Sequence, residues 1–199
     1  MTPRIDALLA RLHDMQDELE AAFDERRAAL RYRVEKGRVI FEEGVQEAHR
    51  AARIRLWVFL RRTRILVALT APVIYSLIIP FVLLDISLIV YQAICFPVYR
   101  IPKVRRRDYI VIDRQQLGYL NGVQKLNCVY CGYGNGLLAY AREVAARTEQ
   151  YWCPIKHAAR VTGVHEHYPN FADYGDAEGY LTRQEALRAA LRKTADTAN

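Results

Sequence analysis

The strongest pattern along the chain is an apolar run from Ile65 to Tyr99 that contains a single charged residue, Asp85. A run of about 18 or more apolar residues is typical of a membrane segment. As one straight helix, these 35 residues would extend over roughly 52 Å, whereas the hydrocarbon core of a bilayer is about 30 Å thick. The pattern therefore predicts a mainly α membrane protein whose apolar run, residues 64–100, bends.

Prolines and flanking charges predict how the run bends. Pro80 lacks an amide hydrogen near the middle of the run, as Pro72 does earlier, and Asp85 suits a helix cap just beyond it. Positive residues flank both ends and favour the cytoplasm, so we expect a helical hairpin with both termini cytoplasmic. Legs of about 16 to 18 residues, roughly 24 to 27 Å, are marginal for crossing. A re-entrant wedge, a single tilted span followed by an interfacial helix, and a buried soluble hairpin stay open.

Asp85 is a candidate site because an ionisable side chain at membrane depth is costly and often functional. Its first interpretation is a helix cap or a hydrated turn at the tip of the hairpin. Pairing with a basic group of a partner chain is the second. Proton or ion handling is the third, although the run holds no other charge to which Asp85 could relay a proton.

Before the run, residues 1–63 have a helical pattern. Thr2 and Pro3 suit a helix start, and apolar residues then step by three and four along one side: Ile5, Leu8, Leu12, Met15, Leu19 and Ala22. The pattern loosens over residues 31–37 and resumes over 39–60. We expect a coiled coil that self-associates or binds a partner in a membrane complex, or else a helix folded back on its own chain.

Charge supports the membrane interpretation. The chain has 199 residues, a formal net charge of +7 and a pI of about 9.3. The basic residues cluster beside the apolar run, where Lys and Arg attract anionic lipid headgroups by about 1 kcal/mol each. The predicted headgroup contacts are Arg61, Arg62, Arg64, Lys103, Arg105, Arg106 and Arg107. Nucleic acid is not expected, because the bilayer already accounts for the basic residues. The first residues lack the apolar core of a secretory signal.

Residues 101–170 contain the candidate metal ligands. Cys128-x2-Cys131 places two sulfurs on one expected turn, and Cys153-x3-His157 supplies a third sulfur and a nitrogen, a set that tetrahedral zinc accepts. His165 and His167 are alternates for the fourth ligand. We expect a strand over 108–113, and a helix over 136–150 that the metal holds at both ends. A thiol redox pair is the alternative.

The stretch CVYCGYGNG resembles the first knuckle of rubredoxins and zinc ribbons, and YWCPIKH resembles the second, with His157, one residue further on, in place of their last cysteine. That resemblance implies a zinc-ribbon-like α+β unit, and the histidine favours Zn²⁺ over Fe. The whole chain is also similar to a family of bacterial membrane proteins of uncharacterised function that carry the same motifs, which implies a bacterial inner-membrane location.

Residues 171–199 read as a loop and a last amphipathic helix that opens with a capping box, Thr182-x-x-Glu185. The chain lacks a phosphate-binding glycine loop and the common hydrolase motifs. Together these features predict a non-catalytic membrane adaptor or accessory subunit with a structural zinc site. The alternative is a redox component that serves a membrane enzyme, either a rubredoxin-like iron carrier or a thiol exchanger. The pattern identifies no enzyme activity, and the lack of these motifs favours a non-enzymatic role without excluding an enzyme.

Overall fold

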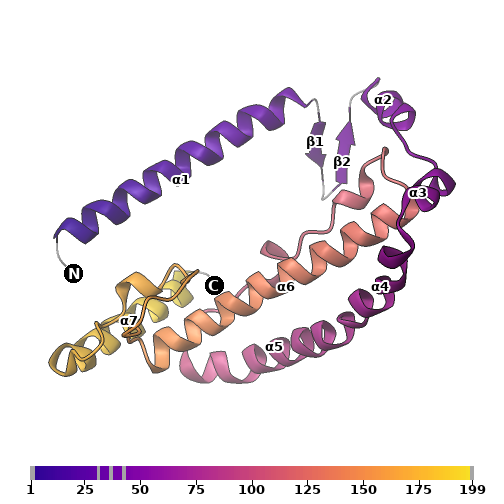
Figure 1. Ribbon diagram of the computed structural model, residues 1–199. Helices are drawn as coiled ribbons and strands as arrows, with labels where there is room; N and C mark the ends of the chain where they lie inside the picture. The colour runs from indigo at the N-terminus through magenta and orange to yellow at the C-terminus, as the bar shows by residue number, and fades with distance from the viewer. Residues whose placement is uncertain (1–2, 31, 36–37, 42–43, 198–199) are drawn as a thin grey trace. The chain divides into compact units, whose positions relative to one another are not determined.

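A computed structural model describes residues 3–30, 32–35, 38–41 and 44–197 of the protein (Figure 1). These residues form a mostly helical structure of two compact units. The N-terminal unit comprises residues 1–64 and 112–129, and the C-terminal unit comprises residues 65–111 and 130–199.

The N-terminal unit contains the long helix that the pattern predicts, and a hairpin that it does not predict. Helix α1 (Pro3–Ala29) is followed by strands β1 (Tyr32–Glu35) and β2 (Arg38–Phe41), which pair antiparallel, and then by α2 (Val45–Ala51) and α3 (Leu56–Arg62). The prediction that the helix resumes at residue 39 was therefore wrong, since β-branched and aromatic residues such as Val39, Ile40 and Phe41 favour a strand. The predicted cap at Thr2 lies outside the described residues.

The apolar run bends much less than predicted. Helix α4 (Ile65–Ser76) and helix α5 (Ile78–Tyr99) follow one another with a break only at Leu77 (Figure 1). The missing amide of Pro80 explains the position of this break, because that amide would have bonded to Ser76. Pro80 itself lies in the first turn of α5, where proline is tolerated. The predicted hairpin turn between Pro80 and Asp85 was therefore wrong, and Asp85 lies within a helix.

A charged segment runs back along α5 before the next helix begins. This return segment, residues 100–111, contains only the short 3₁₀ turn η1 (Arg106–Asp108). The strand predicted over 108–113 was wrong, and a second 3₁₀ turn, η2 (Arg114–Gln116), follows. Helix α6 (Gly122–Trp152) then lies beside α5 and runs in the same direction (Figure 1). Near one end of the two helices, the Phe81 ring lies against Gly134. Near the other end, the rings of Tyr99 and Tyr151 stack with their centroids 5.2 Å apart.

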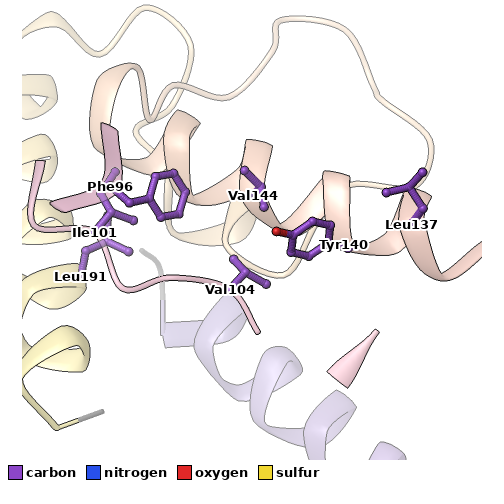
Figure 2. Close-up of a cluster of buried hydrophobic side chains, with 7 residues drawn as sticks. All are labelled: Phe96, Ile101, Val104, Leu137, Tyr140, Val144 and Leu191. Atoms are coloured by element: carbon purple, nitrogen blue, oxygen red, sulfur yellow. The ribbon is translucent and has the colours of Figure 1, made fainter. Parts of the chain in front are cut away.

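The core of the C-terminal unit lies where α5, the return segment, α6 and α7 meet. Figure 2 shows the buried apolar cluster, in which the rings of Phe96 and Tyr140 are the largest members. The return segment contributes Ile101 and Val104 to this cluster, and α7 contributes Leu191. The cluster consists of Phe96, Ile101, Val104, Leu137, Tyr140, Val144 and Leu191.

The last helix, α7 (Ala177–Thr197), closes the end of α6. The backbone carbonyl of Trp152 accepts from Gln184 Nε2 at 2.8 Å, and that of Tyr151 accepts from Arg188 Nε at 2.7 Å. These bonds satisfy carbonyls that a helix end leaves without partners. The helix predicted near the C-terminus is confirmed, but it begins at Ala177 rather than at Thr182. Asp176 Oδ1 accepts from the Gly179 amide at 2.9 Å at this start. The third 3₁₀ turn, η3 (Tyr168–Asn170), lies in the loop before it.

Candidate functional site

The buried carboxylate of Asp85 pairs with an arginine of its own chain. Arg106 donates from Nε to Asp85 Oδ1 at 2.9 Å and from Nη2 to Oδ2 at 2.6 Å. Tyr133 on α6 donates its hydroxyl to Oδ2 at 2.9 Å. The structure thus corrects both leading interpretations of Asp85, a cap and a contact with a partner chain. The contacts of Asp85 with Arg106 and Tyr133 join α5, the return segment and α6 at one point.

The pair is asymmetric in its exposure. The side chain of Asp85 is 9% exposed, whereas that of Arg106 is 42% exposed. Burial, and then the hydrogen bond to Asp85, raise the pKa of Tyr133, so its hydroxyl remains a donor at neutral pH. Arg106 was predicted to contact lipid headgroups, but the structure commits its guanidinium to the carboxylate of Asp85.

A second polar site lies two helical turns beyond Asp85. Gln92 accepts from the Val104 amide at 2.7 Å and donates to the hydroxyl of Tyr140. Arg147 holds the same segment from α6, donating from Nη1 to the Pro102 carbonyl at 2.7 Å. The sequence held a signal for this site, because residues seven apart in a helix share one side. Asp85 and Gln92 have this spacing, and both bond to the return segment.

The opposite side of α5 is apolar and exposed. We call this surface the outer face of α5. The 35-residue stretch of α4 and α5 is the one helix among the described residues that is long and apolar enough to cross a membrane, and 6% of its most apolar part is buried. The outer face of α5 comprises Ile79, Val82, Leu83, Ile86, Ile89, Val90, Ile94 and Val98.

The structure does not bring the four predicted zinc ligands together. Cys128 and Cys131 lie one turn apart within α6, and Cys153 follows the end of the same helix. The 22 residues from Cys131 to Cys153 place them roughly 33 Å apart along the helix, whereas zinc–sulfur bonds are about 2.3 Å long. The expected zinc-ribbon knuckles were therefore wrong. This arrangement fits neither one zinc ion nor a rubredoxin-type iron.

His157 lies in the loop after α6 and contacts Tyr168. Its ring stacks on Tyr168 at 6.1 Å, and its amide donates to the Tyr168 hydroxyl at 2.7 Å. Although Cys153 is exposed, partial desolvation of its thiol and the nearby charge of Glu149 raise the pKa of that thiol, which disfavours the thiolate that metals and redox chemistry need. Among the described residues there is no group of three or more His, Cys, Asp or Glu side chains that could hold a metal ion. A thiol pair of Cys128 and Cys131 stays a prediction.

Replacing Cys128, Cys131 and Cys153 together by serine is expected to change the free energy of unfolding by less than about 1 kcal/mol, because surface substitutions have small effects. Cys131 and Cys153 are exposed and Cys128 is partly exposed. Circular dichroism and metal analysis of the purified wild type and variant would check this. Loss of one zinc per chain together with loss of helix would restore the predicted site.

The two alternate histidines bond to α6 rather than to a cysteine. His165 Nε2 lies 2.9 Å from Glu149 Oε2, and His167 Nε2 lies 3.2 Å from Glu143 Oε1. Arg147 also donates to Glu143, at 2.7 Å. Burial alone would raise the pKa of Glu143, but the hydrogen bonds from His167 and Arg147 outweigh it and hold the pKa below its ordinary value. These contacts attach the loop of residues 153–176 to α6.

The lowered pKa of Glu143 predicts that part of the stability is lost in acid. A group whose pKa is lower in the folded state stabilises the fold above its unfolded pKa, here about 4.5, and loses that contribution as the pH falls through the folded pKa. Glu143→Gln should cost about 1 kcal/mol at pH 7. It should cost progressively less below pH of about 4.5. Denaturant unfolding at a series of pH values checks this, and a difference independent of pH would contradict it.

The remaining predicted headgroup contacts are exposed: Arg61, Arg62, Arg64, Lys103, Arg105 and Arg107.

The N-terminal unit also holds a cavity of about 300 Å³ that sequence reasoning missed. His49 lies there between Phe41 and Tyr119, with ring centroids 4.8 and 5.0 Å away. The distance in sequence between residues 49 and 119 explains why no local pattern indicated this contact.

Comparison of the chain with protein-family models, with curated proteins and with solved structures found no match.

Proposed function

We propose that the protein is a non-catalytic, membrane-anchored adaptor. The observation that carries this proposal is the apolar stretch of α4 and α5. Its mean hydropathy is 2.5, and the described chain buries only 6% of its most apolar part. Exposed apolar patches of such extent are typical of membrane or protein contacts. The surrounding basic residues favour a bilayer with anionic headgroups.

Two further features support an adaptor. The buried polar side chains of the C-terminal unit bond to one another and to the return segment, so Asp85, Arg106 and Gln92 have a structural role. The apolar residues of α1 lie exposed at coiled-coil spacing and suit a partner helix, in a second copy or in another subunit. These residues are Ile5, Leu8, Leu12, Met15 and Leu19.

The membrane part of the proposal is tested by flotation of the purified full chain with vesicles. We expect the protein to float with phosphatidylcholine mixed with phosphatidylglycerol, and to float less with phosphatidylcholine alone or at high salt, because salt screens the basic residues. Protein that stays at the bottom of the gradient with both lipids would contradict the anchor.

The adaptor part is tested by native mass after mild detergent extraction. The variant Leu8→Asp with Leu12→Asp places charge on the proposed seam of α1, whereas Glu18→Lys with Glu20→Lys changes exposed charges of the same helix and is the control. We expect the seam variant to remain in the membrane and to lose a partner or second copy that the control retains. An unchanged mass for the seam variant would overturn this role of α1.

A further inference from the structure

The path of the return segment constrains how α5 meets the bilayer. Two parallel neighbouring helices need a connection that runs back along their length, and here residues 100–111 begin that return beside α5. From the end of α5 at Tyr99 to the contact between Arg106 and Asp85, the chain covers 14 helical residues of α5, roughly 21 Å. If this part of α5 crossed a membrane, the return segment would lie at the same depths beside it.

The return segment is unsuited to the hydrocarbon core. Six of its twelve residues are charged, and most of it is not helical. The side chain of Arg107 is 80% exposed and that of Arg105 is 70% exposed. An arginine at the centre of a bilayer costs about 2.5 to 3.5 kcal/mol even on a helix, and lipid-exposed irregular backbone does not occur there. A crossing α5 would bring these groups into lipid.

Helix α6 leads to the same conclusion. It contacts the apolar stretch from α4 onward, where the Tyr130 hydroxyl donates to the Ile74 carbonyl at 2.6 Å. It continues to the end of α5, and this second half carries Arg142, Glu143, Arg147 and Glu149. The part of α4 before Ile74 is nine residues, roughly 14 Å of helix. It is too short to cross a core of about 30 Å by itself.

We propose that α5 lies parallel to the membrane surface, with its outer face in lipid and with α6 and the return segment on the aqueous side. This inference rests on the proposed membrane anchor and names its geometry. The occupant of the outer face is a bilayer with anionic headgroups, since the face carries no charge while the residues that follow α5 in the chain include four exposed basic ones, Arg100, Lys103, Arg105 and Arg107. A helix of this kind inserts about 5 to 10 Å into the headgroup and acyl boundary.

The test is the depth of spin labels in vesicles of phosphatidylcholine and phosphatidylglycerol. In a cysteine-free background, single cysteines replace Ile79, Ile86 and Ile94, which lie on the outer face of α5. Labels at Lys103 and Leu181, both exposed, are the aqueous controls. Accessibility to oxygen and to a polar nickel complex gives the depth of each label. Variants at Val82, Val90 and Val98 form a second set in case a first variant fails to fold.

We expect the three outer-face labels to lie at one shallow depth and the controls to lie in water. A crossing helix would instead give depths that differ by roughly 22 Å between residues 79 and 94, and this would overturn the inference while leaving the anchor intact. Labels shielded from both lipid and water would assign the face to a second copy and also overturn it. Failure of the wild type to float would contradict the anchor itself.

Discussion

Arg106→Ala is expected to lower the free energy that holds the return segment in place by about 3 kcal/mol. Removal of one partner from a buried ion pair costs about 3 to 5 kcal/mol because the other charge stays buried. The lower end applies because 42% of the Arg106 side chain is exposed. Asp85 would keep only the hydrogen bond from Tyr133 in its place.

Cleavage of the native protein by trypsin measures this effect, since arginines and Lys103 of the return segment become substrates when it opens. A loss of about 3 kcal/mol corresponds to cleavage about 100-fold faster. Arg105→Ala is the matched control. It removes one cleavage site as well, but it breaks only an exposed pair with Asp108, worth about 1 kcal/mol or less.

A second substitution separates the buried charge from the lost contact. Adding Asp85→Asn to Arg106→Ala should recover part of the stability, because the amide is uncharged and its burial costs less. Equal cleavage rates for Arg106→Ala and Arg105→Ala would contradict the structural role of the pair.

Gly136→Ala is expected to destabilise the same packing by about 2 kcal/mol. A Cβ at this position would lie 2.6 Å from the Tyr109 carbonyl oxygen and 2.9 Å from Ile110 Cα. Both atoms belong to the backbone of the return segment, so the clash cannot be relieved by a side-chain rotation. Overpacking costs up to about 3 kcal/mol, and alanine regains about 1 kcal/mol of helix propensity.

Two glycines of the same helix are controls for Gly136. At Gly134 the nearest atom to a new Cβ is the ring carbon Cε2 of Phe81 at 2.9 Å, and this ring can shift, so Gly134→Ala should cost less. At Gly122 no atom lies within 4 Å, so Gly122→Ala should be neutral or slightly stabilising. Thermal unfolding followed by circular dichroism gives the order, and a Gly136→Ala variant as stable as Gly134→Ala would contradict the close approach.

The same glycines explain the largest error of the sequence interpretation. In CGYGNG the pattern of cysteine and glycine is typical of a metal knuckle, because glycine favours turns. Here Gly134 and Gly136 instead lie in a helix and allow Phe81 and the backbone of residues 109–110 to approach it. Propensity cannot distinguish these uses, since a contact between residues 110 and 136 is absent from any local window.

The hairpin was wrong for a related reason. Basic residues on both sides of the apolar run indicate that both ends are in water, which a hairpin satisfies and which a helix lying at the surface satisfies too. Pro80 suits a turn, but proline is also accepted in the first turn of a helix. The contacts of Gln92 with Val104 and of Asp85 with Arg106 show that the chain runs back beside α5 as a mostly irregular segment.

Local sequence pattern was enough to predict some features of the fold. These are the helical character of the chain, the apolar surface of residues 65–99, the helix around 136–150 and a last helix near the C-terminus. Three features follow only from the tertiary structure. They are the pairing of the buried polar residues, the parallel course of α5 and α6, and the separation of Cys153 from Cys128 and Cys131. Helix periodicity and hydropathy act over a few residues, whereas these contacts join positions at least 12 residues apart in the chain.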